Sequence, residues 1–186
     1  LFRSMKNYYF YMLVIILGLS SCQTMEDEEI FTIYLVRHAE KVLNSGDSND
    51  PDLTLCGAQR AEAISKFLSD VKLDIIYSTD YIRTQNTAGP TALSKELKPV
   101  KYDPNELEAF SKVLIDRKQD ALVVGHSNTT GVLAGLLVGE EIGEFDTSIY
   151  NRIYQVVLHK ERGRLHVLHT AFKCVGSNEK AEQILD

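Results

Sequence analysis

Residues 32–40 read Thr-Ile-Tyr-Leu-Val-Arg-His-Ala-Glu, and this stretch decides how the rest of the chain is interpreted. The apolar, β-branched run that it contains, Phe31 to Val36, has the length and composition of a buried strand. Arg37, His38 and Glu40 follow the run directly. Ligands of open α/β sheets bind beyond the carboxyl ends of the strands. The stretch therefore predicts a strand and, at its end, a candidate functional site.

Strands and helices are expected to alternate along the rest of the chain. Apolar periodicity predicts helices at residues 57–68, 83–97, 104–117 and 128–138, and strands at residues 73–77, 100–102 and 121–124. Gly89-Pro90 is expected to kink or interrupt the second helix. Residues 152–159 and 165–171 predict a hairpin about Arg162-Gly163. The predicted fold class is α/β, a three-layer α/β/α sandwich with a mostly parallel central sheet and a C-terminal antiparallel hairpin.

The composition excludes several classes of protein. The 186 residues include 20 Lys plus Arg and 26 Asp plus Glu, for a net charge of -6. Such an acidic chain is not expected to bind nucleic acid, because a duplex-binding protein needs basic surface. Three cysteines without a C-x-x-C pair argue against a structural zinc or iron–sulfur site. Cys56 and Cys174 could pair in an oxidising compartment, but two buried free thiols are the simpler expectation.

The first 22 residues predict an export signal rather than a part of the fold. Their apolar run, Tyr8 to Leu19, is shorter than the about 20 residues of a spanning helix and suits a signal-peptide core. Leu19-Ser20-Ser21-Cys22 resembles a bacterial lipobox, in which Cys22 would be lipidated and would anchor the protein in the cell envelope. A plain secretory signal is the alternative. The expected organisation is a lipoprotein signal peptide at 1–22, an acidic tether at 23–30 and one domain at 31–186.

Cationic and imidazole side chains follow three of the predicted strands. Arg83 and His126 each come shortly after a later strand, as Arg37 and His38 come after the first. If these strands are neighbours, two arginines and two histidines meet at one edge of the sheet. Such a cluster in an acidic protein predicts a polyanionic ligand, phosphate foremost. A guanidinium fork matches phosphate oxygens, and a neutral histidine could attack phosphorus.

Four sequence motifs, taken together, resemble those of the histidine phosphatase superfamily, which has the phosphoglycerate-mutase-like fold. We call them the family motifs. They are Arg37-His38-Ala39-Glu40, Leu53-Thr54-Leu55-Cys56-Gly57, the segment from Ser78 to Ala88 that contains Arg83, and Val124-Gly125-His126-Ser127. The motifs occur in the same order as in the family, over about residues 31–130. The short chain is most like the small phosphohistidine-phosphatase type.

This resemblance implies a metal-independent phosphatase that hydrolyses phosphate monoesters or phosphoramidates without a cofactor. His38 would be the nucleophile and form a phosphohistidine. Arg37 and Arg83 would hold the phosphoryl oxygens, and His126 would donate to the same oxygens and stabilise the charge during transfer. Glu40 is expected to be a structural partner.

The general acid is the least defined residue of this prediction. Asp103 follows the third predicted strand, where the family often has a carboxylate, and Glu106 and Glu108 are rivals. Lack of a clear acid would suit good leaving groups such as phosphohistidine, whereas an exported enzyme would meet small esters such as sugar or nucleotide phosphates. Asn44 is a further candidate for contact with the phosphate, although a loop Asn is more often turn chemistry.

Other functions stay open. The same fold could be a non-catalytic phosphate-binding or partner-binding lipoprotein, or a mutase. Gly125-His126-Ser127 also resembles a serine-hydrolase elbow with Ser127 as nucleophile, although the expected last Gly is Thr129. Asp146 and then His159 or His166 would complete that triad.

Two histidine patterns could suggest a metal site, but the sequence favours neither. His38-Ala39-Glu40 mimics the H-x-E of zinc deaminases without the cysteines that should follow. His159, His166 and His169 on the hairpin are expected to be surface residues rather than metal ligands. We therefore expect no metal.

Overall fold

The structure is a computed structural model that describes residues 30–43, 50–160 and 162–174. The expected signal peptide, most of the tether, Cys22 and Asn44 lie outside the described residues. Among the described residues, no helix is long and apolar enough to cross a membrane.

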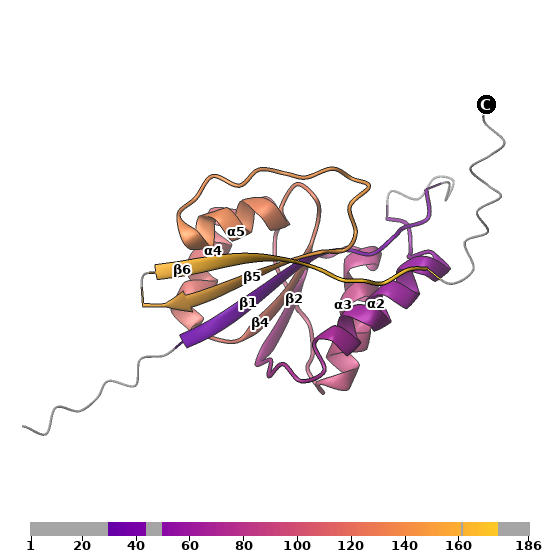
Figure 1. The fold of residues 1–186 in the computed structure, drawn as a ribbon, viewed down its shortest axis with the longest axis horizontal. Helices are drawn as coiled ribbons and strands as arrows, with labels where there is room; N and C mark the ends of the chain where they lie inside the picture. The colour runs from indigo at the N-terminus through magenta and orange to yellow at the C-terminus, as the bar shows by residue number, and fades with distance from the viewer. Residues whose placement is uncertain (1–29, 44–49, 161, 175–186) are drawn as a thin grey trace, which may run out of the picture.

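Within the described residues, four helices and six strands alternate as the fold class requires, and Figure 1 shows their arrangement. The strands are β1 (Ile30–Arg37), β2 (Ile75–Ser78), β3 (Val100–Lys101), β4 (Ala121–Gly125), β5 (Arg152–His159) and β6 (Arg162–His169), and the helices are α2 (Leu55–Phe67), α3 (Ile82–Ser94), α4 (Leu107–Arg117) and α5 (Thr130–Val138). They form one sheet in the order β3-β2-β4-β1-β5-β6. The first four strands are parallel to one another. β5 pairs antiparallel with β1, and β6 pairs antiparallel with β5. The predicted α/β fold with a C-terminal hairpin is confirmed.

Alternate side chains of β1 enter two separate cores, one on each face of the sheet. Ile33 and Leu35 pack in the core that α4 and α5 cover, whereas Tyr34 and Val36 pack in the core under α2 and α3. Figure 1 shows the two helix pairs on opposite sides of the sheet. Burial of β1 on both faces explains why its sequence is a continuous apolar run rather than an alternating one.

Two expectations about helices need correction. The helix expected from residue 104 begins only at Leu107, so Pro104 lies in the preceding loop. The expected break at Gly89-Pro90 is absent, because α3 continues through Pro90. The carbonyl that a proline frees in this position belongs to Asn86, an exposed residue, where water can satisfy it.

The hairpin turn also lies elsewhere than predicted. His159 pairs with Arg162 and Leu158 pairs with Gly163, so Arg162 and Gly163 are strand residues. A Cβ at Gly163 would lie 2.8 Å from Val138 Cγ1 and 2.9 Å from the Leu137 carbonyl. This glycine therefore permits close approach of α5 to the sheet, which is a tertiary reason that the turn-like sequence conceals.

The long loop after α5 folds back over that helix because two helical glycines leave room. A Cβ at Gly131 would lie 2.4 Å from the Gly143 carbonyl, and one at Gly135 would lie 2.4 Å from the Glu140 carbonyl. Phe145 N donates to the Ser127 carbonyl at 3.2 Å, which holds the loop beside the end of β4. The loop thereby reaches the edge of the sheet where the candidate residues meet.

Candidate active site

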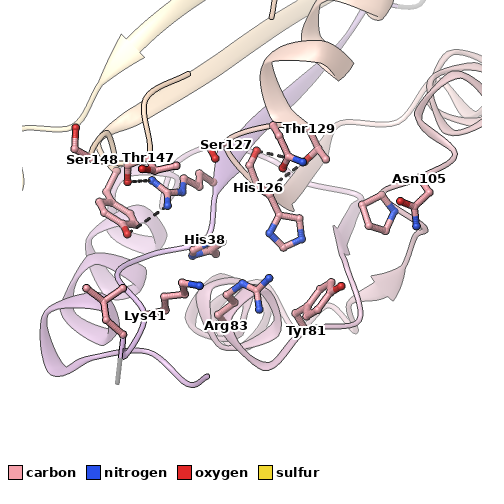
Figure 2. A pocket seen from close by; sticks show the side chains of 15 residues that line it. His38, Lys41, Tyr81, Arg83, Asn105, His126, Ser127, Thr129, Thr147 and Ser148 are labelled. Atoms are coloured by element: carbon pink, nitrogen blue, oxygen red, sulfur yellow. Dashed lines mark hydrogen bonds between the residues drawn. The ribbon is translucent and has the colours of Figure 1, made fainter. Parts of the chain in front are cut away.

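The ends of β1, β2 and β4 are adjacent in the sheet, and the four predicted side chains meet there. Arg37, His38, Arg83 and His126 all line one cavity of about 760 Å³, which Figure 2 shows from close by. We call these four residues the floor. The remaining lining residues, which we call the outer wall, come from loops and helix N-caps: Lys41, Leu43, Tyr81, Pro104, Asn105, Ser127, Asn128, Thr129, Thr147, Ser148 and Tyr150.

His38 is held as a neutral imidazole with one free nitrogen. The side chain is 4% exposed, and its Nδ1 lies 2.8 Å from the Ala39 carbonyl. A carbonyl only accepts, so Nδ1 carries the proton and Nε2 keeps its lone pair. Burial lowers the pKa of His38 to about 3 against the opposing effect of the Ala39 bond, and the positive charges of Arg37, His126 and Arg83 lower it further. Nε2 thus keeps a free lone pair at neutral pH, which is what a nucleophile requires.

Both arginines donate hydrogen bonds to the protein through Nη1, and Arg37 also does so through Nη2. Arg37 Nη1 donates to the carbonyls of Thr147 and, at 3.2 Å, Ile149, while Nη2 donates to Tyr150 Oη at 3.3 Å. Arg83 Nη1 donates to Asp50 Oδ1 at 3.3 Å. Within the described part of the chain, the buried Nε of each arginine has no acceptor. Two arginines that line one cavity, each with an unpaired buried donor, indicate an oxyanion site.

His126 presents its other ring nitrogen because a hydroxyl pair holds Nε2. The Thr84 hydroxyl donates to the Thr79 or Tyr81 carbonyl, at 3.0 and 2.8 Å. It therefore accepts from Thr79 Oγ1, 2.9 Å away, and Thr79 Oγ1 accepts from His126 Nε2 at 3.1 Å. Burial, followed by the nearby charges of Arg83, Arg37 and Lys41, lowers the pKa of His126 to about 4. Nδ1 is the atom left to gain a proton when an anion binds.

Comparisons with known proteins agree with this geometry. The model of the histidine phosphatase superfamily (branch 1) matches residues 33–110. Over these residues the chain resembles the superfamily, and the matched region includes Arg37, His38 and Arg83. Fructose-2,6-bisphosphatase TIGAR of Xenopus laevis is 34% identical over 83 residues, 40% of this chain and 30% of the relative. Phosphoserine phosphatase 1 of Hydrogenobacter thermophilus is 39% identical over 75 residues, 38% of this chain and 36% of the relative. Each match thus spans about a third of the relative's length.

The fold also resembles solved structures of histidine phosphatases. The protein histidine phosphatase SixA, solved with tungstate, superposes with a TM-score of 0.64 at 17% identity, over 75% of this chain and 97% of that one. At this identity the likeness concerns the fold.

Two of the family motifs hold the backbone beside His38. Thr54 caps α2 by accepting from Gly57 N at 3.0 Å, and its own hydroxyl lies 3.3 Å from the Glu40 carbonyl. A Cβ at Gly57 would lie 2.1 Å from that carbonyl. Thr87 Oγ1 accepts from Ala39 N at 2.9 Å. Both contacts fix the backbone that carries His38.

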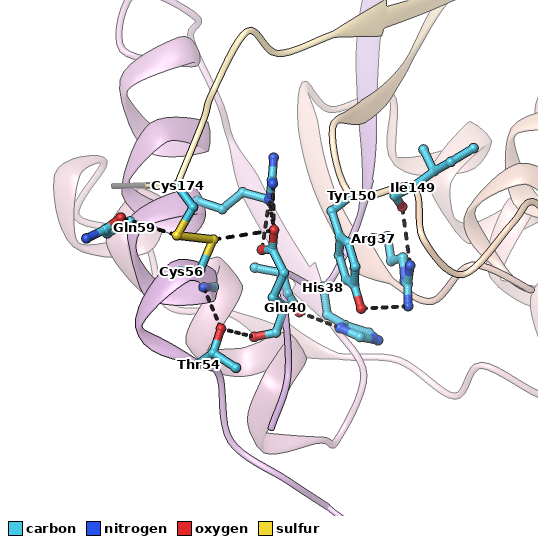
Figure 3. A network of polar contacts seen from close by, with 12 residues as sticks. Arg37, His38, Glu40, Thr54, Cys56, Gln59, Ile149, Tyr150 and Cys174 are labelled. Carbon is cyan, nitrogen blue, oxygen red and sulfur yellow. Dashed lines mark hydrogen bonds and ion pairs between the residues drawn. A yellow bond between two sulfur atoms is a disulfide. The ribbon is translucent and has the colours of Figure 1, made fainter. Parts of the chain in front are cut away.

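Glu40 is a structural partner, as expected, and its partner is Arg60. Arg60 Nε lies 2.8 and 2.9 Å from the two carboxylate oxygens of Glu40. The pair lies behind the floor, where Arg60 is also 6.0 Å from the Tyr150 ring that covers Arg37. Figure 3 shows this network beside His38.

The predicted acid is not part of the cavity. Asp103 is exposed and accepts from both the backbone N and Nδ2 of Asn105 at 2.9 Å. Glu106 and Glu108 are exposed at the start of α4. Because α4 starts late, the turn from Asp103 places Pro104 and Asn105 on the outer wall instead. No Asp or Glu of the described residues lines the cavity.

The triad of the serine-hydrolase alternative is not assembled. Ser127 lines the cavity, but Asp146 is exposed and accepts from Ser148 N. His159 pairs with Ile30 at the opposite end of the sheet. His166 lies on β6, three strands from β4, which is about 14 Å at the usual spacing. Among the described residues, no three His, Cys, Asp or Glu side chains gather as metal ligands would.

The expectation of free thiols is wrong, because Cys56 and Cys174 form a disulfide with Cα atoms 5.3 Å apart. The bond ties the first turn of α2 to the segment after β6, which Figure 1 shows crossing to that helix. Phe172 of this segment lies 4.8 Å from the Arg60 guanidinium. Sequence alone gave no distance for a pair separated by 118 positions.

Proposed function

We propose that this protein is a phosphatase that transfers the phosphoryl group of its substrate to His38 and then to water. The observation that carries the proposal is the floor: a neutral, backbone-oriented His38 between two anchored guanidiniums with free Nε atoms. Phosphoryl transfer depends mainly on such positioning and charge stabilisation. The names of TIGAR, phosphoserine phosphatase 1 and SixA all refer to phosphatases, which supports the reaction class without naming a substrate.

In the first step, His38 Nε2 attacks phosphorus opposite the leaving group. The N–P bond forms, the bond from phosphorus to the leaving group breaks, and the leaving group keeps that electron pair. The Nε–Nη2 edges of Arg37 and Arg83 hold the non-bridging oxygens. In the second step, water attacks the phosphohistidine, the N–P bond breaks and its electron pair returns to Nε2. His126 takes up a proton at Nδ1 when the dianion binds, keeps it, and donates a hydrogen bond through it to a non-bridging oxygen.

The outer wall selects for the leaving group. An alkoxide leaves poorly unless it is protonated, and general acids supply about 100- to 10,000-fold. Since the described residues place no carboxylic acid on the cavity, we propose phosphoramidates, aryl phosphates and acyl phosphates as better substrates than alkyl phosphates. Asn105 and Tyr81 stand where such a leaving group would lie.

Release of nitrophenol from p-nitrophenyl phosphate by the purified full chain tests the proposal. Turnover is expected to persist in EDTA and to vanish in His38→Ala, while Ser127→Ala keeps it. An acid-labile phosphoprotein should accumulate in a rapid quench. Protection by vanadate against thermal unfolding without any turnover would instead indicate the binding-module alternative.

We also propose that the protein is exported and lipid-anchored at Cys22. The lipobox-like sequence supports this, and the Cys56–Cys174 disulfide suits an oxidising compartment. Labelling with a palmitate analogue in a bacterial host should mark the wild-type chain and not Cys22→Ser. Labelling of both, or of neither, would contradict the proposal.

A further inference from the structure

Lys41 is a further cationic side chain of the cavity, and neither the predicted mechanism nor the family motifs use it. Its backbone is fixed, because residue 41 forms a bridge with Leu53 and Val42 N donates to the Asp52 carbonyl at 2.9 Å. Its side chain is half-buried and lines the cavity. Figure 2 shows its amino group directed into the cavity beside His38 and Arg83. In the described part of the chain, no carboxylate pairs with it.

The donors of the floor are already enough for a phosphoryl group. After their protein contacts, Arg37 and Arg83 each keep Nε and an Nη2 hydrogen, which is the edge that binds an oxyanion with two parallel bonds. His126 adds Nδ1. These groups provide about five donors for three non-bridging oxygens. The ammonium of Lys41 is therefore not needed to saturate the phosphoryl group.

The charges lead to the same conclusion. Arg37, Arg83 and a protonated His126 carry three positive charges, and the carboxylate of Asp50 beside Arg83 removes one. Two positive charges remain and balance a phosphoryl dianion. Lys41 adds one more positive charge, and no Asp or Glu of the described residues lines the cavity to balance it. A partly desolvated ammonium without a counter-charge is unfavourable, so a substrate that brings another negative charge would be preferred.

We propose that Lys41 binds a second anionic group of the substrate, a carboxylate or a second phosphate, outside the phosphoryl position. The proposal rests on the proposed phosphatase function and narrows its substrates to phosphate compounds that carry a further negative charge. The cavity of about 760 Å³ has room for it, because a phosphoryl group fills only a small part. Leu43 and Tyr81 would border the connecting part of such a substrate.

A matched pair of substrates tests this on the full chain. Phenyl phosphate and 4-carboxyphenyl phosphate differ by one carboxylate, and both have aryl leaving groups that need no acid. Their kcat/KM values are measured for wild type, Lys41→Gln, Lys41→Arg and the control Lys112→Gln, which makes the same charge change on the exposed side of α4. Differences in folding cancel in the ratio of the two kcat/KM values within each variant. The difference in leaving group cancels when these ratios are compared between variants.

We expect Lys41→Gln to lower this ratio by about 10- to 100-fold, mainly through KM, as loss of a charge-assisted hydrogen bond does. Lys41→Arg should keep most of the preference, and Lys112→Gln all of it. Equal losses on both substrates would overturn the proposal and assign Lys41 to the transferred phosphoryl group. Unchanged values on both would overturn it as well.

Binding without turnover separates this proposal from the proposed function. In a His38→Ala background, calorimetry with the same two compounds should show tighter binding of the carboxylated one, and Lys41→Gln should abolish that difference. If wild type hydrolyses neither compound but the difference in binding is present, the phosphatase function fails and the Lys41 site stands. No difference in binding overturns the site even if turnover is found.

Discussion

The floor and the outer wall of the cavity are built by different means. Floor residues lie at strand ends or in the first turn of α3, and buried contacts fix them: the Ala39 carbonyl for His38, the loop carbonyls for Arg37, and Thr79 for His126. Wall residues lie in connecting segments and are more exposed. The groups that we propose to react are thus held at the ends of rigid elements, while loops hold the groups that we propose to select the substrate. The reaction class should be insensitive to the wall, and the substrate should depend on it.

Replacing a floor arginine with lysine should have the largest effect. Lysine keeps the charge but loses the fork that holds two oxygens. We expect Arg37→Lys and Arg83→Lys each to lower kcat/KM for p-nitrophenyl phosphate by about 100- to 1,000-fold, or about 3–4 kcal/mol. Arg162→Lys, on the exposed end of β6, is the control. Losses below about 10-fold in both floor variants would show that charge alone suffices there.

The disulfide ties the first turn of α2 to the segment after β6 and should stabilise the folded chain. Removing a bond that closes a long loop typically costs about 2–4 kcal/mol of unfolding free energy. Cys56→Ser and Cys174→Ser should each lower stability in urea by about this amount, and dithiothreitol should lower that of wild type equally. The double variant should be no less stable than either single one. If dithiothreitol has no effect on wild type, the bond does not form in the protein.

Acid should destabilise the floor more than the wall. The pKa values of His38 and His126 are lowered to about 3 and about 4 from an ordinary value of 6.5. Between these values and about pH 6.5 the unfolded chain binds more protons than the folded one. Stability therefore falls as pH falls through this window, by about 1 kcal/mol per pH unit for each histidine.

Urea unfolding between pH 6.5 and pH 5 measures this slope. His38→Gln and His126→Gln should each reduce the slope by about 1 kcal/mol per pH unit, and carboxylates contribute equally to all three proteins. His166→Gln, on the exposed face of β6, should leave it unchanged. Identical slopes in all four proteins would mean that the floor histidines titrate normally.

The floor could be predicted from sequence because its residues are fixed by local position. Arg37 and His38 end a strand, and the order of a parallel sheet brings His126 beside them. The outer wall could not, since Tyr150 reaches Arg37 only through a loop whose path depends on Gly131 and Gly135. Lys41 directly follows the first family motif, and its charge could have marked it as a candidate ligand-binding residue. Nothing local marks Thr147 or Ile149, which act through backbone carbonyls.

Asp103 lies off the cavity for a related reason. The loop before α4 brings Pro104 and Asn105 to the cavity, but not Asp103. Instead Asp103 is used locally, as an acceptor for the backbone and side chain of Asn105. Asp and Asn are favoured in such turns for this local bonding. A residue type that suits two roles does not reveal which one it has.

Substitution of Asp103 should therefore have the smallest effect. Asp103→Asn keeps an oxygen that accepts from Asn105 N, so the turn is preserved while the acid is removed. We expect kcat/KM to change by less than about 3-fold, or about 0.7 kcal/mol, for both p-nitrophenyl phosphate and an alkyl phosphate. Glu106→Gln, equally exposed in the same segment, is the matched control. A loss confined to the alkyl substrate in Asp103→Asn would make Asp103 the general acid, and it would require the segment from Asp103 to Asn105 to close over bound substrate. The outer wall would then take part in the chemistry as well as in selection, and the division between floor and wall would have to be given up.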